Sequence, residues 1–249
     1  MLHVIDLFCG AGGFSEGARQ AGAVVVLAVD CWREALDVHA ANHPDAEHWC
    51  EEIGTGDPAE LAQRLRAFAA NALPPGAPVH LHASPPCQSL SKANRASRDT
   101  SGGLRLTRFA LDVIEAARFD SWTVEQVSAP AVRGLFDARG VLYRHLACDK
   151  LGVPSIRRRL IAASETLEDM QECIDRPLTL RQAMDRADMS APPGFEVQRD
   201  GSTKDTRRRL DDVSYTVTTR SPILWNDARR RELSLSIATI KVLQTGRGR

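Results

Sequence analysis

Short apolar runs alternate with amphipathic helical segments along the first two thirds of this chain, and each run stops at a glycine, a proline or an acidic residue. The runs at Leu2–Phe8, Ala23–Asp30 and Val79–Ala83 are nearly continuous, which is typical of strands buried on both faces of a parallel sheet. Two more strands are expected at Trp122–Val127 and Arg159–Ala163.

Helices are expected between these strands, at Ser15–Gln20, Trp32–Asn42, Pro58–Asn71 and Leu106–Ala117. Asp57 before Pro58 marks a helix start, because an acidic N-cap followed by proline suits the first turn. Strands that alternate with helices predict an α/β fold with a doubly wound, mostly parallel sheet. Functional sites in such sheets lie at the carboxyl ends of strands.

The alternation weakens after residue 164. With 249 residues, we expect a catalytic and cofactor-binding domain at 1–164 and a small, irregular recognition region with a C-terminal helix at 165–249. In that region Ala191–Arg209 is expected to be irregular, Ser214–Arg220 a strand and Ala228–Leu243 a helix. The polar stretch Ser89–Gly103 is expected to be a mobile loop.

Composition excludes several classes of protein. A chain that is 43% hydrophobic and 26% charged is neither disordered nor collagen-like, and no apolar run is long enough to span a membrane. The six cysteines form no C-x-x-C pair, which favours a reducing cytosol, so we expect a cytoplasmic protein without a membrane partner. His80 and His82 share a strand face without a third ligand, so no metal site is expected.

The net charge of zero hides an asymmetry. Through Val124 the chain has 10 basic and 15 acidic residues, and after it 22 and 17. A basic second half could meet a polyanion, although such an excess is also common on ordinary solvated surfaces.

The first strand runs into a glycine turn, Cys9-Gly10-Ala11-Gly12-Gly13, that opens a helix. Glycines let a ligand approach the backbone, and the helix N-terminus offers free N–H groups. Asp30 ends the next strand, where a carboxylate can accept from ribose hydroxyls. This arrangement favours a nucleoside-containing cofactor, and a tight turn without a ligand is the alternative.

Two other strand ends carry reactive groups. Cys87 follows two prolines at the end of the third strand, where a thiolate can act as a nucleophile, although a lone cysteine is more often a small buried hydrophobic residue. Glu125 lies within an apolar strand, which is costly unless the carboxylate faces a pocket or a partner. A paired structural carboxylate is the alternative for Glu125.

Four ordered motifs resemble the cytosine-C5 DNA methyltransferase family. They are DLFCGAGGFSEG at Asp6–Gly17, PPCQSLS at Pro85–Ser91, VEQV at Val124–Val127 and GVPSIRRR at Gly152–Arg159. A weaker match, SYTVTTR followed by RRELSLSIATIKVLQT, extends the resemblance to about Thr245. The resemblance implies a Rossmann-like fold that uses S-adenosylmethionine.

The resemblance also implies the reaction. Cytosine in double-stranded DNA would be flipped into the site. Cys87 would attack its C6, and Glu125 would bind its N3 edge. Arg159, and more loosely Arg157, would reach the cytosine O2 and the nucleotide phosphate, since a guanidinium donates in a fork.

Cofactor residues carry over in the same way. Asp6 and the turn at Gly10, Gly12 and Gly13 would hold the methionine part, Phe8 would lie against the adenine, and Asp30 would accept from the ribose. Glu52 and Ile53 would touch the adenine, and Pro86 and Leu106 would complete the wall of the pocket. These assignments are expectations from the motif positions.

Several positions depart from the family pattern. Gln126 stands where the family favours an asparagine that braces the catalytic loop, so a looser loop is expected, and Ser155 replaces a glutamine. The recognition region is short, which predicts weak or very short sequence specificity. The last family motif is not found, so we expect a second polypeptide to supply it, a short form that works without it, or an inactive relative.

Three functions stay open at this point. The first is methylation of DNA cytosine. The second is the same chemistry on transfer RNA, although the Cys-Phe-Thr tripeptide of that family branch is absent. The third is a noncatalytic relative that binds nucleic acid or cofactor.

Overall fold

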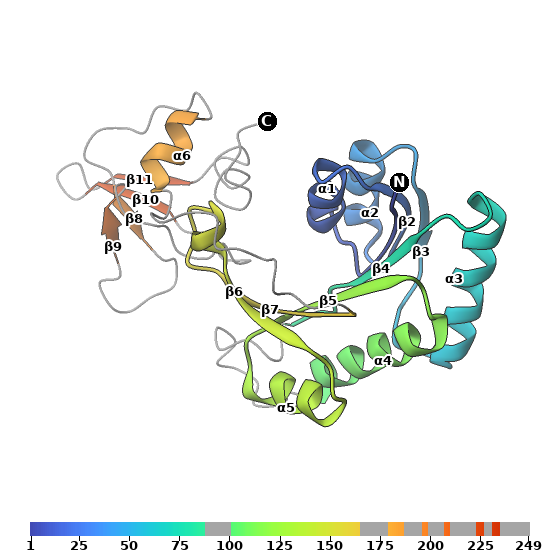
Figure 1. Cartoon of the computed structure of the whole chain (residues 1–249). Coiled ribbons are helices and arrows are strands. Elements are labelled where there is room, and N and C mark those ends of the chain that lie inside the picture. The colour runs from blue at the N-terminus through green and yellow to red at the C-terminus, as the bar shows by residue number, and fades with distance from the viewer. Residues whose placement is uncertain are drawn as a thin grey trace. The chain divides into compact units, whose positions relative to one another are not determined.

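A computed structural model describes residues 1–87, 101–164 and 179–186, together with the backbone of four short strands farther along the chain. Its main feature is a seven-stranded sheet in the order β3-β2-β1-β4-β5-β7-β6 (Figure 1). The strands are β1 His3–Leu7, β2 Val24–Asp30, β3 Glu47–Cys50, β4 Val79–Ala83, β5 Ser121–Val127, β6 Tyr143–Ala147 and β7 Arg158–Ala163.

Strands β3, β2, β1, β4 and β5 run parallel, with Asp6 of β1 opposite Ala28 of β2 and His82 of β4. The strand order reverses direction between β1 and β4. A crevice outside the carboxyl ends is expected at this switch point, because the connections leave the two strands in opposite directions.

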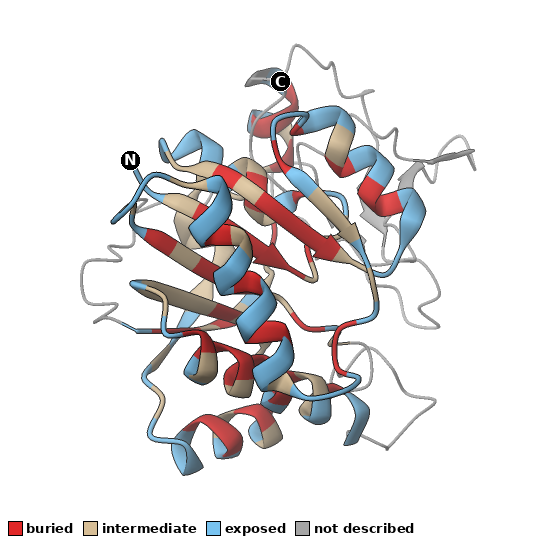
Figure 2. Ribbon diagram, turned by 90° about the vertical axis from the view of Figure 1, so that its right-hand side faces the viewer, coloured by how far each residue is buried: buried red, intermediate tan, exposed pale blue. Residues whose placement is uncertain are grey.

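Five helices cover the two faces of this sheet (Figure 1). Helices α1 and α2 lie against β1, β2 and β3, and α3, α4 and α5 lie on the other face, with α4 packed against both α3 and α5. Their bounds are α1 Gly13–Gln20, α2 Arg33–Asn42, α3 Pro58–Ala72, α4 Ser101–Ala117 and α5 Pro130–Ala138. Figure 2 shows buried residues on the central strands and on the helix faces toward them.

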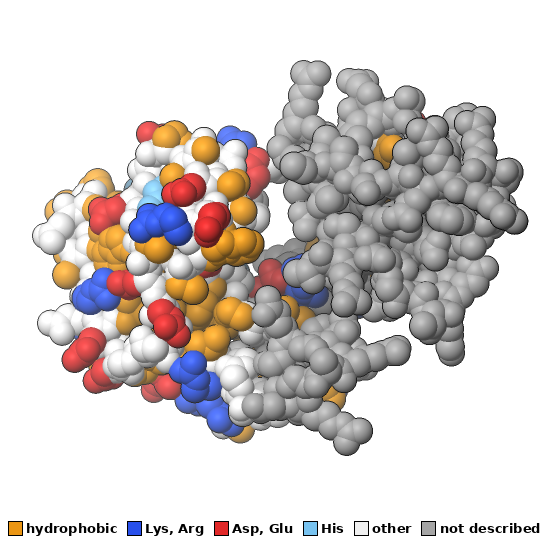
Figure 3. All heavy atoms as spheres, turned by 180° about the vertical axis from the view of Figure 1, so that it is seen from behind, with side chains coloured by type: hydrophobic (Ala, Val, Ile, Leu, Met, Phe, Trp, Pro, Cys, Tyr) orange, Lys and Arg blue, Asp and Glu red, His pale blue; other side chains and the backbone are white. Residues whose placement is uncertain are grey.

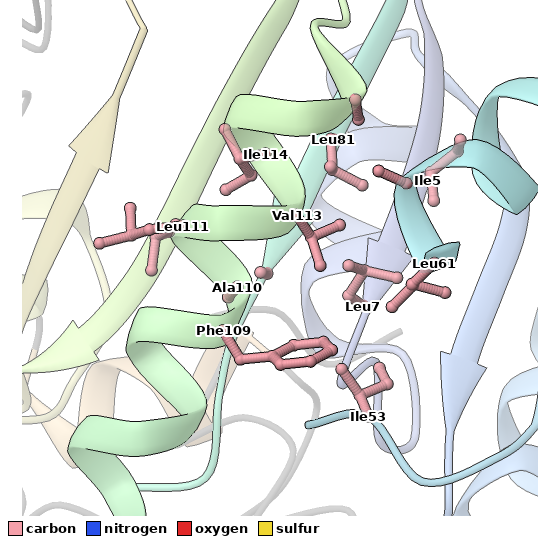
Figure 4. Close-up of a cluster of buried hydrophobic side chains, with 14 of the residues drawn as sticks. Ile5, Leu7, Ile53, Leu61, Leu81, Phe109, Ala110, Leu111, Val113 and Ile114 are labelled. Carbon is pink, nitrogen blue, oxygen red and sulfur yellow. The ribbon is translucent and has the colours of Figure 1, made fainter. Parts of the chain in front are cut away.

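The main core lies between the sheet and helices α3 and α4. Figure 4 shows Leu61 and Phe109 pointing from the two helices toward the strand residues Ile5 and Leu7, with Ile53 beside them. These side chains are at most 8% exposed. The same apolar cluster therefore supports the strand ends that carry the candidate site residues.

The two strands at the far edge of the sheet, β7 and β6, run in opposite directions. The N–H of Ala163 donates to the carbonyl of Leu142, and the N–H of Cys148 donates to that of Arg157. Because residue numbers rise along one strand while they fall along the other, β6 and β7 are antiparallel. The sheet is therefore mixed but mostly parallel, which confirms the predicted fold class.

Contacts divide the chain into two compact units, one of Met1–His145 with Leu160–Leu167 and the other of Leu146–Arg159 with Glu168–Arg249. The second unit holds η1 Cys148–Leu151, α6 Leu180–Arg186 and a four-stranded antiparallel sheet in the order β11-β10-β8-β9. Its strands are β8 Glu196–Gln198, β9 Arg207–Arg209, β10 Ile223–Asn226 and β11 Arg231–Ser234.

Sequence patterns located the first-unit strands β1, β2, β4 and β5, as well as β7, to within one residue at each end. They missed β3, α5 and β6, which are short or lack a clear apolar period. Asp57 caps α3 as predicted, since its Oδ1 accepts from the Ala59 N–H at 2.9 Å.

Three expectations for the polar segments are wrong where the structure describes them. The loop expected at Ser89–Gly103 ends earlier, because α4 already begins at Ser101. Strands β8 and β9 lie in the segment expected to be irregular, and β11 lies in the expected C-terminal helix. Pairing with β10 overrides the helical pattern at β11, since β10 supplies its ladder partners. The strand expected at Ser214–Arg220 lies outside the described residues, as does the predicted loop over 89–100.

Helix α6 has a start signal that the sequence shows. The Thr179 hydroxyl accepts from the Gln182 N–H at 3.2 Å, and the Gln182 side chain accepts from the Thr179 N–H at 3.0 Å. This is a capping box, and it satisfies two N-terminal donors at once.

The surface gives two further observations. On the face drawn in Figure 3, acidic and basic side chains of the described atoms are interspersed with hydrophobic ones. Within the parts of the chain that the structure describes, no helix is long and apolar enough to cross a membrane.

Gly54 offers a direct test of the packing. Its φ is +104°, and an added Cβ would meet Leu106 Cδ2 at 2.2 Å. We expect Gly54→Ala to lower the free energy of unfolding by about 3 kcal/mol in urea denaturation, because it adds a steric clash to backbone strain. Gly56→Ala is the matched control, since φ there is +75° but the Cβ meets nothing within 4 Å. We expect it to cost about 1 kcal/mol, and equal losses in the two variants would contradict the packing.

Candidate functional site at the sheet switch point

The ends of β1 and β4 are joined by two hydrogen bonds from Ser84. Its N–H donates to the Leu7 carbonyl at 3.1 Å, and its hydroxyl donates to the Phe8 carbonyl at 3.1 Å. Phe8 has a φ of +58°, a left-handed conformation that costs a non-glycine residue about 1–3 kcal/mol. The structure therefore holds the glycine turn and the segment leading to Cys87 side by side, at the expense of local strain.

The glycine turn has two kinds of glycine. Gly10 (φ +52°) faces open space, since an added Cβ would meet nothing within 4 Å. Gly12 (φ +94°) is buried, and an added Cβ would lie 3.0 Å from the His39 ring and 3.3 Å from the His43 ring. Gly10 thus leaves room for a ligand, whereas Gly12 is required for close packing against α2. Gly13 is exposed at the first position of α1.

Asp30 is tied to the backbone of its own loops. One carboxylate oxygen accepts from the Gly10 N–H at 2.9 Å, and the other accepts from the Trp32 N–H at 2.9 Å. Asp30 is half-buried, so its remaining lone pairs can still accept from a ribose. The carboxylate therefore also fixes the shape of the glycine turn.

Asp6 is completely buried and accepts a hydrogen bond from the Ser15 hydroxyl at 2.7 Å. Burial raises its pKa to about 7, with the charges of Asp30 and Glu125 acting in the same direction and the bonds from Ser15 opposing it. Its Oδ1 is buried without a partner among the described residues. Asp6 has no exposed surface in this structure, and its expected contact with the cofactor stays a prediction.

Cys87 is half-buried and carries a free thiol. The buried Gln126 amide holds its loop from β5: Nε2 donates to the Pro85 carbonyl at 3.1 Å and to the Thr107 hydroxyl at 3.2 Å. Thr107 in turn donates to the Gly103 carbonyl at 2.8 Å. Thr107 of α4 thus holds the longer side chain within reach of Pro85, and the expectation of a looser catalytic loop stays a prediction.

Glu125 is half-buried on β5, next to the buried Gln126. Its charge contributes to the raised pKa of Asp6, which indicates that the two carboxyl groups belong to the same electrostatic environment. Asp30 and Glu125 give the switch point a negative potential, which favours a cationic ligand. Burial, and to a lesser extent the charges of Asp6 and Asp30, raise the pKa of the Cys9 thiol, which disfavours the thiolate that a nucleophile needs.

The expected adenine wall is partly assembled. Ile53 is buried, and Leu106 of α4 lies against Gly54, where its side chain fills the space of the missing Cβ. The Arg105 guanidinium donates to the Gly54 carbonyl. Two other expected wall residues, Glu52 and Pro86, are exposed.

The arginine motif belongs to the second unit. Arg157 precedes β7, and its carbonyl accepts from the Cys148 N–H. The Arg159 guanidinium donates to the Arg158 carbonyl at 2.9 Å, and Arg158 pairs with the buried carboxylate of Asp149. The expected contacts of Arg157 and Arg159 with substrate stay predictions.

The histidines of β4 have structural partners. His80 bonds to Ser121 and Thr123 at 2.8 and 2.9 Å, and His82 bonds to Thr123 at 2.8 Å. The Phe14 ring stacks on His82 with centroids 3.4 Å apart. Residues 1–87, 101–164 and 179–186 contain no group of three His, Cys, Asp or Glu side chains able to hold a metal ion.

Sequence reasoning missed Thr107, Ser15 and His39 as parts of the site. Their partners lie 9 to 24 residues away along the chain, so no local pattern points to them. The helical period gave one usable signal, since Thr107 is a polar residue on the buried face of α4.

Comparison with known proteins agrees with this geometry. A family model described as C-5 cytosine-specific DNA methylase matches residues 2–116. Type II methyltransferase M.HgiGI of Herpetosiphon aurantiacus is 32% identical over 114 residues, which cover 46% of this chain and 79% of that protein. The chain belongs to the C-5 cytosine-specific DNA methylase family.

Other family members are longer. Type II methyltransferase M.AgeI of Thalassovita gelatinovora is 33% identical over 173 residues, which cover 64% of this methylase-family chain but only 38% of M.AgeI. The chain therefore spans well under half the length of that relative.

Solved structures share the fold. A DNA modification methyltransferase encoded within an E. coli prophage superposes with a TM-score of 0.58 at 22% identity, covering 82% of this chain and 59% of that one. For Spodoptera frugiperda DNMT2 the TM-score is 0.51 at 19% identity, covering 80% and 63%. These similarities show that this family member has the methyltransferase fold.

The charge of Asp6 predicts a pH-dependent stability. Because its folded pKa is about 7 against an ordinary 3.8, the stability that Asp6 contributes is complete below about pH 4 and is lost as pH rises through about 7. We expect the free energy of unfolding of Asp6→Asn to exceed that of wild type increasingly as pH rises from about 4 to about 7. The difference should reach about 4 kcal/mol at the upper end of this range. Urea denaturation at a series of pH values measures the difference.

The pKa values of His39 and His82 are lowered by burial to about 4 and about 3, so both residues destabilise the fold on acidification. Both histidines are present in wild type and in Asp6→Asn, so their contributions cancel in the difference in unfolding free energy between the two proteins. The exposed Asp37→Asn is the control and should follow the wild type. A constant difference between Asp6→Asn and wild type across the pH series would contradict the burial of a costly charge.

Proposed function

We propose that this protein transfers a methyl group from S-adenosylmethionine to C5 of cytosine in DNA, through a covalent bond between Cys87 and C6 of a flipped-out base. The observation that carries the proposal is the Gln126 hydrogen bond to the Pro85 carbonyl. It ties the loop that bears the thiol to the strand that bears Glu125, so that a nucleophile and an acid are held at one switch point.

The chemistry follows from these two side chains. The Cys87 thiolate adds to C6 of the ring, and the electron pair displaced toward C5 makes C5 nucleophilic. Glu125 donates to N3 and accepts from the exocyclic amine, which stabilises the charge that develops on the ring. After methylation, loss of the C5 proton returns the electron pair and expels the Cys87 thiolate.

The residues at the glycine turn fit the cofactor. When bound, S-adenosylmethionine supplies an electrophilic methyl group on a sulfonium centre. Gly10 leaves open space at the turn, and the carboxylates of Asp6, Asp30 and Glu125 suit a ligand with net positive charge. Asp30 accepts from the ribose, and Phe8, Ile53 and Leu106 provide apolar surface for the adenine.

DNA is the proposed partner, with the flipped cytosine held by the forked donors of Arg157 and Arg159. Each guanidinium group presents several N–H donors in one plane, which suits contact with a phosphate and the O2 of the base.

Covalent trapping tests the proposal. DNA that contains 5-fluorocytosine cannot lose a proton from C5, so the bond to Cys87 should persist through denaturation. We expect a stable adduct of protein with fluorinated DNA in the presence of S-adenosylmethionine. A shifted band on a denaturing gel measures it, together with tritium transfer to unmodified DNA.

Cys87→Ala should abolish both signals, whereas Cys31→Ala should leave both at the wild-type level, because Cys31 is an exposed cysteine outside the proposed chemistry. Transfer to transfer RNA alone would replace DNA with RNA as the substrate. Cofactor binding without transfer or adduct would favour a noncatalytic relative and would overturn the proposal.

A further inference from the structure

Four side chains form a continuous line of hydrogen bonds from the buried end of β1 to the edge strand β3. Ser15 bonds to Asp6 at 2.7 Å, His39 Nε2 to Ser15 Oγ at 2.9 Å, and His48 Nε2 to His39 Nδ1 at 2.8 Å. Asp6, Ser15 and His39 have no exposed surface, and His48 is half-buried. The line therefore connects a fully buried carboxyl group to solvent.

The line lies directly beneath the glycine turn. An added Cβ on Gly12 would lie 3.0 Å from the His39 ring, and Ser15 belongs to the helix that the turn opens. Helices α1 and α2, which carry Ser15 and His39, are neighbours on the same face of the sheet (Figure 1). A change of charge in the line therefore changes the electrostatic potential at the turn.

Counting protons leaves two neutral arrangements of this line. A hydrogen bond to the Ala46 backbone favours the protonated His48 ring, so we assign the far nitrogen of His48 as a donor to the Ala46 carbonyl, which can only accept. In the first arrangement Asp6 is protonated and donates to Ser15, Ser15 donates to His39, and His39 donates from Nδ1 to His48. In the second Asp6 is ionised, His39 donates from Nε2 to Ser15, and His48 is an imidazolium that donates from both nitrogens. One proton hop at each bond converts one into the other.

The surroundings decide between the two. Burial and the carboxylates of Asp30 and Glu125 disfavour an ionised Asp6 in the free protein. A cationic ligand at the turn would reverse this preference. The titratable groups that adjoin the line from neighbouring elements are Cys9, Glu16, Arg19, Asp30, His43, His82 and Glu125.

We propose that Ser15, His39 and His48 form a proton relay that keeps Asp6 uncharged in the free protein and carries its proton to His48 when a cationic cofactor occupies the glycine turn. His39 is the positioning residue, because its tautomer fixes the direction in which the Ser15 hydroxyl points. The part that concerns the cofactor rests on the proposed function, whereas the relay itself does not.

The tautomer of His39 in the free protein tests the relay. We expect long-range proton–nitrogen NMR spectra to show the Nδ1–H form at about pH 6 and the Nε2–H form at about pH 9. Raising the pH removes one proton from the line, so one hydrogen bond is lost. The lost bond is the one between His39 and half-buried His48, where water can replace it. A tautomer that does not change over this range would overturn the relay.

Two variants separate the relay from a packing effect. In His48→Phe the Nδ1 of His39 loses its acceptor, so His39 should stay in the Nε2–H form throughout. In His43→Phe, which alters a buried ring beside His39 but outside the line, the wild-type change should persist. If His48→Phe keeps the change, the proposal is wrong. Dispersed amide spectra in both variants verify that they are folded.

The cofactor gives a third measurement at about pH 6. S-adenosylmethionine, which carries a net positive charge, should shift His39 to the Nε2–H form, whereas the uncharged thioether S-adenosylhomocysteine should not. Equal effects of the two ligands would overturn the cofactor part. If neither ligand binds, the proposed function fails while the pH titration still decides the relay.

Discussion

The hydrogen bond from the Gln126 amide to the Pro85 carbonyl is the contact on which the site depends. Proline has no N–H, so the segment at Pro85 cannot be held by a donor of its own, and its carbonyl needs a partner from elsewhere. Gln126 supplies that partner from β5, and the bonds of Ser84 hold the same segment to the end of β1. The ends of β1, β4 and β5 are thereby tied to one another.

This arrangement costs stability in identifiable places. Phe8 adopts a left-handed conformation, and Asp6 is a carboxyl group with a pKa raised by complete burial. Neither feature strengthens the fold, and both lie next to the glycine turn. Such local conflicts are expected where a protein keeps residues for binding or catalysis.

Much of the first unit could be predicted from its sequence. Continuous apolar runs located β1, β2 and β4, because parallel strands covered on both faces leave a strong signal. The edge strand β3 has only four residues and no continuous apolar run, and it gave no such signal. In the second unit, β11 was mistaken for part of a helix, because the pairing that makes it a strand comes from β10, which local patterns do not show.

The motifs named candidate site residues, but they could not predict the hydrogen bonds that hold the segments bearing them. The bond between Gln126 and Thr107 could not be seen in the motifs, because the two residues lie 19 positions apart along the chain. Likewise, no local pattern showed that the buried carboxyl group of Asp6 bonds to Ser15, which in turn bonds to His39.

The most direct measurement is the single-turnover rate of adduct formation between the protein and DNA that contains 5-fluorocytosine, in wild type and in Gln126→Met. Methionine keeps the volume of the side chain but removes the donor to Pro85. We expect Gln126→Met to form the adduct about a hundredfold more slowly than wild type, with unchanged cofactor affinity. Thr107→Val should lower the rate of adduct formation by a smaller factor. A Gln126→Met protein that forms the adduct at the wild-type rate would contradict this account.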